Sequence, residues 1–385
     1  MNQRPKDTQR RLKPTTWFFL LTTLAMVVMV AFGWQRGAWN TGDHSETISF
    51  VSGRVLRITE DQTNVNPSGA RVGFQEMYVE IVQGPHRGRV VHARNTLFPV
   101  EQGFFASEGS RVLLFLNTDS EPFFAHVQSA DRGWGVYGGI GLFFVLLVAV
   151  FGKSGLRSAY SLVFTFVVLA FVLLPLIVQG GSPALLTLLA SAVIMVVSIM
   201  AIMGFSIKTT VSIIGSLVGI GAYVVFYGVL GWMLNLNGFN VQQADALMIL
   251  GFYVGVRELL FCGILIASLG GIMDVSVSLA SVLDELKRTD RTRTQTQLFQ
   301  SAMVVSRDII GSSANTLILA FTGTFFVSLL LFNVNQVPYQ ALINRVDMGI
   351  EVLRALAASS AMVLTAPATA WVGARLFAHR DRSSS

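Results

Sequence analysis

The sequence has little of what a soluble enzyme uses. It contains one cysteine, Cys262, and five histidines, at positions 44, 86, 92, 126 and 379. A single cysteine excludes an intramolecular disulfide and a Cys/His zinc cluster. No histidine falls in an apolar run, which excludes His-based serine or zinc proteolysis inside a membrane. A phosphate-binding P-loop is also missing. We therefore predict no enzymatic activity, no cofactor and no metal.

Charged side chains are equally scarce. Asp, Glu, Lys and Arg make up 13% of the chain, hydrophobic residues make up 52%, and the mean hydropathy is +0.58. Soluble globular domains carry about 25% charged residues, so we predict an integral membrane protein. A membrane-spanning helix needs about 20 mostly apolar residues. Eight continuous runs satisfy this requirement: 17–34, 134–151, 160–178, 184–203, 211–234, 259–283, 311–332 and 350–377.

Basic residues mark one side of the predicted membrane. They occur in the N-terminus, in alternate loops that contain Lys153, Lys208 and residues 287–293, and in the tail. Cytoplasmic loops are enriched in Lys and Arg. We therefore expect the protein in the bacterial plasma membrane, with both termini on the cytoplasmic side. The formal net charge of +6 reflects this topology, and we infer no nucleic-acid site from it.

The first run also resembles a cleavable signal peptide, because basic residues precede it and Ala31-Phe32-Gly33 follow its apolar core. The run is longer than a usual signal core, which favours an uncleaved anchor.

Residues 35–132 contain more than half of the Asp, Glu and His residues taken together, and they have the alternating, β-branched pattern of strands. Strands are predicted at 47–58, 77–82, 89–94, 111–117 and 123–128. Five short strands suit a small barrel of the oligonucleotide/oligosaccharide-binding (OB) type. We expect this extracytoplasmic domain to act as a scaffold or lid, or to bind a ligand or a protein partner.

The predicted fold is thus an all-α polytopic membrane bundle of about eight helices, with a small all-β domain between the first two. The predicted divisions are a basic N-terminus at 1–16, a first span at 17–34, the β domain at 35–132, a bundle of about seven helices at 133–378 and a tail at 379–385. Small residues four apart, Gly215 with Gly219 and Gly263 with Ala267 and Gly271, indicate close helix packing.

Asp274 is the most informative residue of the bundle because it interrupts the apolar run 259–283. An ionisable group at membrane depth costs about 2.5–3.5 kcal/mol on insertion scales, and it usually faces a partner or a polar cavity. Gly270, Asp274, Ser278 and Ser281 fall on one helix face. On the next run, Asp308, Gly311 or Ser312, Asn315 and Thr322 share a face. Because the two helices are antiparallel neighbours, these stripes can meet.

Two interpretations of these residues remain open. In the first, Asp274 exchanges a proton or cation, Asn315 supplies polar ligands, and Ser278, Arg307 and Asp308 complete the path. In the second, Asp274 and Arg307 form a structural ion pair, and Asp308 interacts with a helix dipole. We expect residues 298–310 to lie along the cytoplasmic surface before the chain turns inward.

Two other charged pairs lie near the predicted outer ends of helices. Arg257 and Glu258 are secondary candidates, either for a gate or for an interfacial ion pair. Glu351 and Arg354, three residues apart, are explained by an ordinary helix pair.

Several short segments together carry a family resemblance: Gly152–Gly155, Gly204–Thr210, Val256–Leu260, Leu269–Ser278, Ser306–Gly311 and Asn315–Gly323. Through them, residues 136–377 resemble the YibE/F family of bacterial multi-span membrane proteins, and the β segment resembles the family's usual outer domain. The family commonly has an Asp-Phe-Arg-Gly-like run where this chain has Val256-Arg257-Glu258, which weakens any role for a carboxylate just before Arg257. The resemblance implies a topology but no reaction.

The polar features of runs 259–283 and 311–332 are also similar, by analogy only, to those of proton-driven export proteins. Our leading hypothesis is a proton- or cation-coupled secondary transporter or export-related permease for a small molecule or ion. The alternative is a non-transporting assembly or scaffold protein whose outer β domain binds a protein partner.

Overall fold

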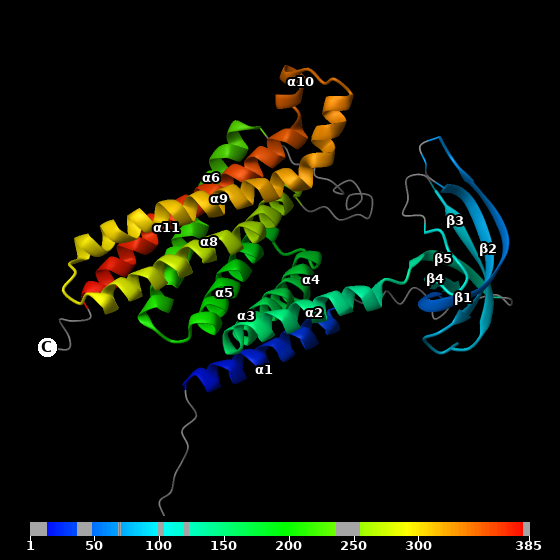
Figure 1. The fold of residues 1–385 in the computed structure, drawn as a ribbon, viewed down its shortest axis with the longest axis horizontal. Helices are drawn as coiled ribbons and strands as arrows, with labels where there is room; N and C mark the ends of the chain where they lie inside the picture. Colours follow the sequence, from blue (N-terminus) through cyan, green and yellow to red (C-terminus); the bar gives the residue numbers. More distant parts are fainter. Residues whose placement is uncertain are drawn as a thin grey trace, which may run out of the picture. The chain divides into compact units, whose positions relative to one another are not determined.

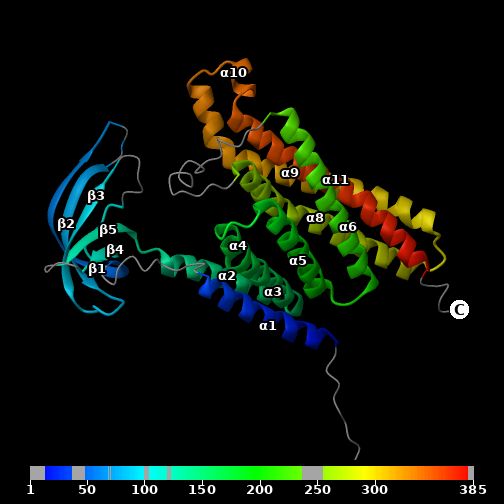
Figure 2. The same ribbon diagram turned by 180° about the vertical axis from the view of Figure 1, so that it is seen from behind.

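The computed structural model describes residues 14–36, 48–67, 69, 71–98, 104–118, 123–235 and 255–379. The chain divides into two compact units: residues 39–150, and residues 1–38 together with 151–385. Figure 1 shows the strands of the first unit and the helices of both, and Figure 2 shows the same ribbon from behind.

The first unit contains a closed five-stranded barrel, which confirms the predicted barrel. Its strands are β1 (Ile48–Val65), β2 (Arg71–Ile81), β3 (Val90–Leu97), β4 (Arg111–Asn117) and β5 (Phe124–Ala130). They are ordered β1-β2-β3-β5-β4, with β3 and β5 parallel and the other pairs antiparallel. Alternate side chains fill the interior, as Val112, Leu114 and Leu116 do on β4.

The strand β1 continues to Val65, beyond the predicted end at residue 58. The additional residues pair with the start of β2 as far as Arg71, and most of them are exposed. Because they cover no core, their sequence lacks the apolar alternation by which a strand is recognised.

Two buried amides fasten the segment between β3 and β4 to the barrel. The Gln75 side chain donates to the carbonyl of Ala106 at 3.2 Å and accepts from the Ala106 N–H at 3.0 Å. Asn95 donates to Gln75 at 3.1 Å and to the carbonyl of Phe104 at 2.7 Å. These bonds satisfy groups that would otherwise be buried without partners.

The strand β5 leads directly into α2 (Gly133–Phe151), a continuous apolar helix. Asp131 connects the two, since its N–H donates to the carbonyl of Arg111 at 3.0 Å and its carboxylate accepts from the N–H of Gly133 at 3.1 Å. The first turns of α2 expose Trp134 and Tyr137.

The second unit is helical. It contains α1 (Pro14–Gln35), α3 (Lys153–Val167), the π-helical turn η1 (Val168–Leu173), α4 (Leu174–Val178), α5 (Pro183–Met203), α6 (Ile207–Met233), α8 (Val256–Thr289), α9 (Gln295–Val334), α10 (Tyr339–Ile343) and α11 (Val346–His379). In the part of the chain that the structure describes, eight helices, α2 included, are long and apolar enough to cross a membrane. They correspond to the eight predicted runs.

One predicted feature of the helical unit is wrong. Residues 298–310 do not form a separate surface segment, because α9 runs without a break from Gln295 to Val334. A capping box between Thr294 and Gln297 starts the helix. The segment contains no proline, and Gly311 alone does not stop a helix.

The helices α6, α8 and α11 form the core of this unit and run side by side in both views (Figures 1 and 2). A Cβ added at Gly219 would collide with Thr365 on α11 and Ile272 on α8, and one at Gly215 would collide with Thr369. These glycines therefore permit the close helix approach that their spacing predicted. In the second predicted series Gly271 packs against Met362, whereas Gly263 faces open space.

The helix α1 packs against α3 and η1. Gly33 approaches the backbone of Phe171, and the Thr22 and Tyr160 hydroxyls lie 2.6 Å apart. Pro175 has no N–H to donate to the carbonyl four residues earlier, which is that of Phe171. The π turn falls at the same place, as is common where the regular bonding pattern of a helix is interrupted.

Candidate functional site

The helix α8 has two different faces. Ile264, Leu265, Ile272, Val275 and Leu279 are almost completely buried against the neighbouring helices of the core. The opposite face carries small or polar residues that remain exposed: Gly263, Ala267, Gly270, Asp274 and Ser281. The helical periodicity of the sequence, with apolar residues on one side and small residues on the other, produces this division.

The exposed face of α8 forms one wall of a cleft with a volume of about 360 Å³. On α8 the cleft is lined by Ala267, Gly270, Gly271 and Asp274. On α9 it is lined by Ser312, Ser313, Thr316, Leu317 and Ala320, and Met362 of α11 completes it. Glycine on α8 leaves the space, and hydroxyl-bearing residues on α9 face the only carboxylate among the residues lining the cleft.

Within the described part of the chain, the Asp274 carboxylate makes no hydrogen bond and no ion pair. The Thr316 hydroxyl donates to the carbonyl of Ser312 at 2.9 Å, so its oxygen remains available as an acceptor. An ionised carboxylate only accepts hydrogen bonds, whereas a protonated one also donates. The cleft can therefore accommodate both protonation states, or a small cation held by oxygen atoms.

The structure brings Asp274 and Ser312 to one cleft, as the facing stripes predicted, but it places Asn315 elsewhere. Asn315, Arg307 and Asp308 are exposed on α9 and do not line the cleft. Ser278 is half-buried one turn beyond Asp274 and also lies outside it. Among the described residues no ion pair joins Asp274 to Arg307, so the geometry lacks the proposed structural pair.

Sequence reasoning missed Ser313 and Thr316. The face of α9 that lines the cleft consists of residues 312, 313, 316, 317 and 320. This face is rotated about the helix axis from the predicted stripe by about 100°, the angle between successive residues. The predicted stripe begins at Asp308, which is exposed in the first part of α9. Thr316, four residues after Ser312, was the available signal.

The secondary candidates Arg257 and Glu258 lie in the first turn of α8. The carbonyl of Arg257 accepts from the Tyr227 hydroxyl at 2.8 Å, and Glu258 accepts from Ser182 at 3.4 Å. In the described ranges these two side chains form no ion pair with each other. The preceding segment, residues 251–254, lies outside the described residues. By contrast, Glu351 and Arg354 form the expected pair at 2.9 Å.

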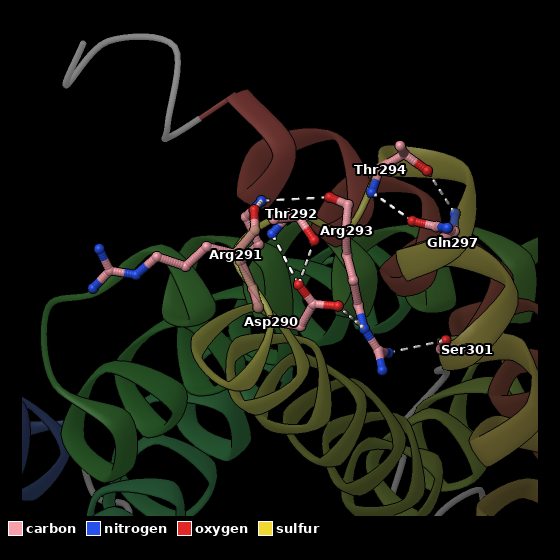
Figure 3. A network of polar contacts seen from close by, with 8 residues as sticks. Asp290, Arg291, Thr292, Arg293, Thr294, Gln297 and Ser301 are labelled. Atoms are coloured by element: carbon pink, nitrogen blue, oxygen red, sulfur yellow. Dashed lines mark hydrogen bonds and ion pairs between the residues drawn. The ribbon is translucent and has the colours of Figure 1, made fainter.

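The turn between α8 and α9 fixes the two walls of the cleft. Asp290 accepts from the N–H and hydroxyl of Thr292 at 3.0 and 2.6 Å, and it pairs with Arg293 at 3.5 Å (Figure 3). Arg293 reaches Ser301 on α9 at 3.4 Å. The Thr292 side-chain hydrogen bond, the Thr292 N–H and Arg293 together lower the pKa of Asp290. This network connects the end of α8 to the first turns of α9.

A second set of charges connects α6 to α8. Asp284 is buried and pairs with Arg288 at 3.1 Å and with Lys208 on α6 at 3.9 Å. The amine of Lys287 donates to the carbonyl of Arg291 at 2.6 Å. These groups lie at the end of the bundle where the sequence concentrates basic residues. They join α6, α8 and the following turn there, and none of these contacts involves Asp274.

Eight apolar helices of membrane length among the described residues, with small residues where α6 meets α8 and α11, indicate a multi-pass membrane protein. The chain belongs to the YibE/F-like protein family, whose model matches residues 139–379. This match confirms the resemblance seen in the sequence. The matched range includes all the residues that line the cleft. Comparisons with curated proteins and with solved structures found no match.

Proposed function

We propose that this protein is a proton- or cation-coupled secondary transporter or export-related permease. The observation that carries the proposal is the position of Asp274 in a cleft lined by hydroxyls, without a counter-charge among the described residues. A carboxylate on a membrane helix is costly to retain, and such residues commonly mark ion pathways and proton relays. Asp274 would exchange a proton or cation, and Ser312, Ser313 and Thr316 would supply its polar surroundings.

We further propose that the helices span the bacterial plasma membrane with both termini in the cytoplasm. The distribution of basic residues supports this orientation. The contacts of Gly33 and Thr22 with η1 and α3 support retention of α1 as an anchor, because cleavage would remove this packing. Cysteine labelling should then mark Glu108→Cys from outside and Thr292→Cys only from inside.

The alternative function is a non-transporting assembly protein whose barrel binds a protein partner. The strand order and the parallel β3–β5 pair support a barrel of the OB type. On the described part of the barrel, four aromatic side chains remain about half exposed, as is common at protein contacts: Phe50, Tyr78, Phe98 and Phe124.

A flux measurement separates the two functions. The purified full-length protein is reconstituted into liposomes that contain a pH-sensitive dye, and proton movement is followed under an imposed potential with Na⁺ or K⁺ outside. The variants are Asp274→Asn, which keeps the size of the side chain, and Asp308→Asn, which changes an exposed aspartate outside the cleft. We expect protein-dependent flux in the wild type and Asp308→Asn, and background flux in Asp274→Asn.

Equal flux in Asp274→Asn and the wild type would contradict the assignment of Asp274. The absence of flux in the wild type under every gradient, together with capture of a partner by the barrel, would favour the assembly function.

A further inference from the structure

A second cleft, separate from the Asp274 site, lies on the barrel. It has a volume of about 390 Å³ and is lined by three arginines and one glutamate: Arg54, Arg87, Arg111 and Glu80. Ile81, Val82, Gly88 and Gly109 complete the lining. The lining carries a net charge of +2, from three cations and one anion. We refer to it as the arginine pocket.

The fold gathers these arginines from three parts of the chain. Arg54 on β1 is paired with Arg111 on β4 and with Glu80 on β2, so the three are cross-strand neighbours. Arg87 comes from the turn between β2 and β3. Like charges directly opposite on a sheet are destabilising, so the barrel retains an unfavourable Arg54–Arg111 pair.

Glu80 offsets only part of the positive charge of the arginine pocket. Within the described ranges, Arg54, Arg87 and Arg111 make no side-chain hydrogen bond, no ion pair and no ring contact. Other arginines of the barrel are engaged, such as Arg71 over Phe105 and Arg94 over Phe74. The nearby backbone is already used, because the N–H groups of Gly88 and Gly109 donate to Ile81 and Val55. Among the described residues that line the pocket, the guanidinium groups therefore offer the free side-chain donors.

The pocket lies at the end of the barrel that continues into α2. The carbonyl of Arg111 accepts from the N–H of Asp131, and α2 begins two residues later, at Gly133. Trp134 and Tyr137, in the first turns of α2, are 72% and 76% exposed. Such aromatic residues concentrate at the level of lipid headgroups. If α2 spans the membrane, Arg111 and its neighbours lie at the depth of the lipid phosphates.

We propose that the arginine pocket binds a phosphate group. Guanidinium groups recognise phosphate oxygens through paired, charge-assisted hydrogen bonds, which suits three free arginines around one cleft. The phosphate is supplied either by the headgroup of an anionic phospholipid or by free phosphate, and the position next to α2 favours the headgroup. This proposal rests on the membrane insertion proposed for α2 and is independent of Asp274.

Arginine modification tests the proposal on the full-length chain in lipid nanodiscs. Phenylglyoxal modification is quantified by peptide mass spectrometry in discs of phosphatidylcholine alone, with added phosphatidylglycerol, or with added inorganic phosphate. We expect phosphatidylglycerol to slow the modification of Arg54, Arg87 and Arg111, whereas Arg57 and Arg94 of the same barrel serve as internal controls. Protection by inorganic phosphate in phosphatidylcholine discs would identify free phosphate as the source.

The variant Arg54→Gln distinguishes a built pocket from general attraction to a charged surface. If three arginines share one phosphate, removing one weakens binding about fivefold, and modification of Arg87 and Arg111 rises correspondingly. A thermal midpoint that does not fall verifies the fold, since Arg54 is exposed and its removal relieves the like-charge pair with Arg111. Three results would overturn the proposal: no protection by either source, equal protection of Arg57 and Arg94, or unchanged protection of Arg111 in Arg54→Gln. The flux assay can fail or succeed independently of all three.

Discussion

The two sides of α8 differ in their surroundings, since one side packs against α6 and α11 and the other borders the cleft. On the side facing α6 and α11, glycines bring the backbones together and the hydroxyls are engaged. Ser216 and Ser276 lie 2.6 Å apart, and Thr365 donates to the carbonyl of Ala361 at 2.8 Å. On the side facing α9, glycine leaves space, and Asp274 is without a hydrogen-bonding partner among the described residues.

Small residues therefore have two different roles on these apolar helices. Gly219 is small because Thr365 and Ile272 occupy the space beside it, whereas nothing in the structure meets a Cβ added at Gly270. A polar group on the packed side contributes to stability, and a polar group on the open side remains available for exchange. Substitutions on the two sides should therefore affect different measurements.

The largest expected effect on stability comes from Gly219→Leu. The added side chain would collide with Thr365 and Ile272, and overpacking of this kind typically costs about 1–3 kcal/mol. The thermal midpoint of the protein in detergent should fall and the folded yield should decrease. Gly221→Leu is the matched control, because Gly221 lies on the same helix and meets nothing within 4 Å. Equal losses in both variants would show that the contact of Gly219 with Thr365 and Ile272 is not responsible, since a change from glycine to leucine by itself favours the helix.

A smaller effect is expected from Ser276→Ala. This change leaves the buried hydroxyl of Ser216 without its partner, and interhelical hydrogen bonds in membrane proteins contribute about 0.6 kcal/mol on average. The measurement is a double-mutant cycle with Ser216→Ala, read as thermal midpoints. Ser281→Ala, on the exposed face of α8, should change nothing. A coupling energy near zero would contradict a stabilising role for the pair.

The smallest effect concerns the turn between α8 and α9. The pKa of Asp290 is lowered, mainly by the Thr292 hydroxyl, so its contribution to stability is complete above the ordinary Asp pKa. The contribution is lost as the pH falls from there through the lowered pKa. Asp290→Asn and Thr292→Ala should each lower the thermal midpoint slightly at neutral pH. In acid, the difference in midpoint between each variant and the wild type should be smaller. A midpoint difference between variant and wild type that grows in acid would contradict a stabilising role of the ionised Asp290.

The sequence predicted the helices well because apolar runs of membrane length have few alternatives in a membrane. It also predicted the five barrel strands, but not the polar extension of β1, the first part of β2 (residues 71–76) that pairs with this extension, or the last three residues of β3. It did not predict which face of α9 turns toward the cleft. Most side chains of α9 are exposed, so apolar residues occur around the whole helix and do not mark one buried face. The prediction therefore placed Asn315 at the site, whereas the structure has Thr316 there.

The arginine pocket was not predicted either. Arg54, Arg87 and Arg111 are far apart in the sequence, and only the pairing of β1 with β2 and β4 brings them together. Such a site depends on strand register, which local sequence patterns specify poorly when the side chains concerned face solvent.

The most direct test of the account is carbodiimide labelling of Asp274 in the full-length protein. Dicyclohexylcarbodiimide enters apolar surroundings and reacts with protonated carboxyl groups, so labelling followed by mass spectrometry reports both access and protonation. We expect Asp274 to be modified, to react more slowly as the pH rises, and to be protected by the cation that drives flux. Asp284, which is ion-paired with Arg288 and Lys208, should remain unmodified. An Asp274 that stays unreactive at every pH, or that reacts no faster than Asp284, would contradict the account.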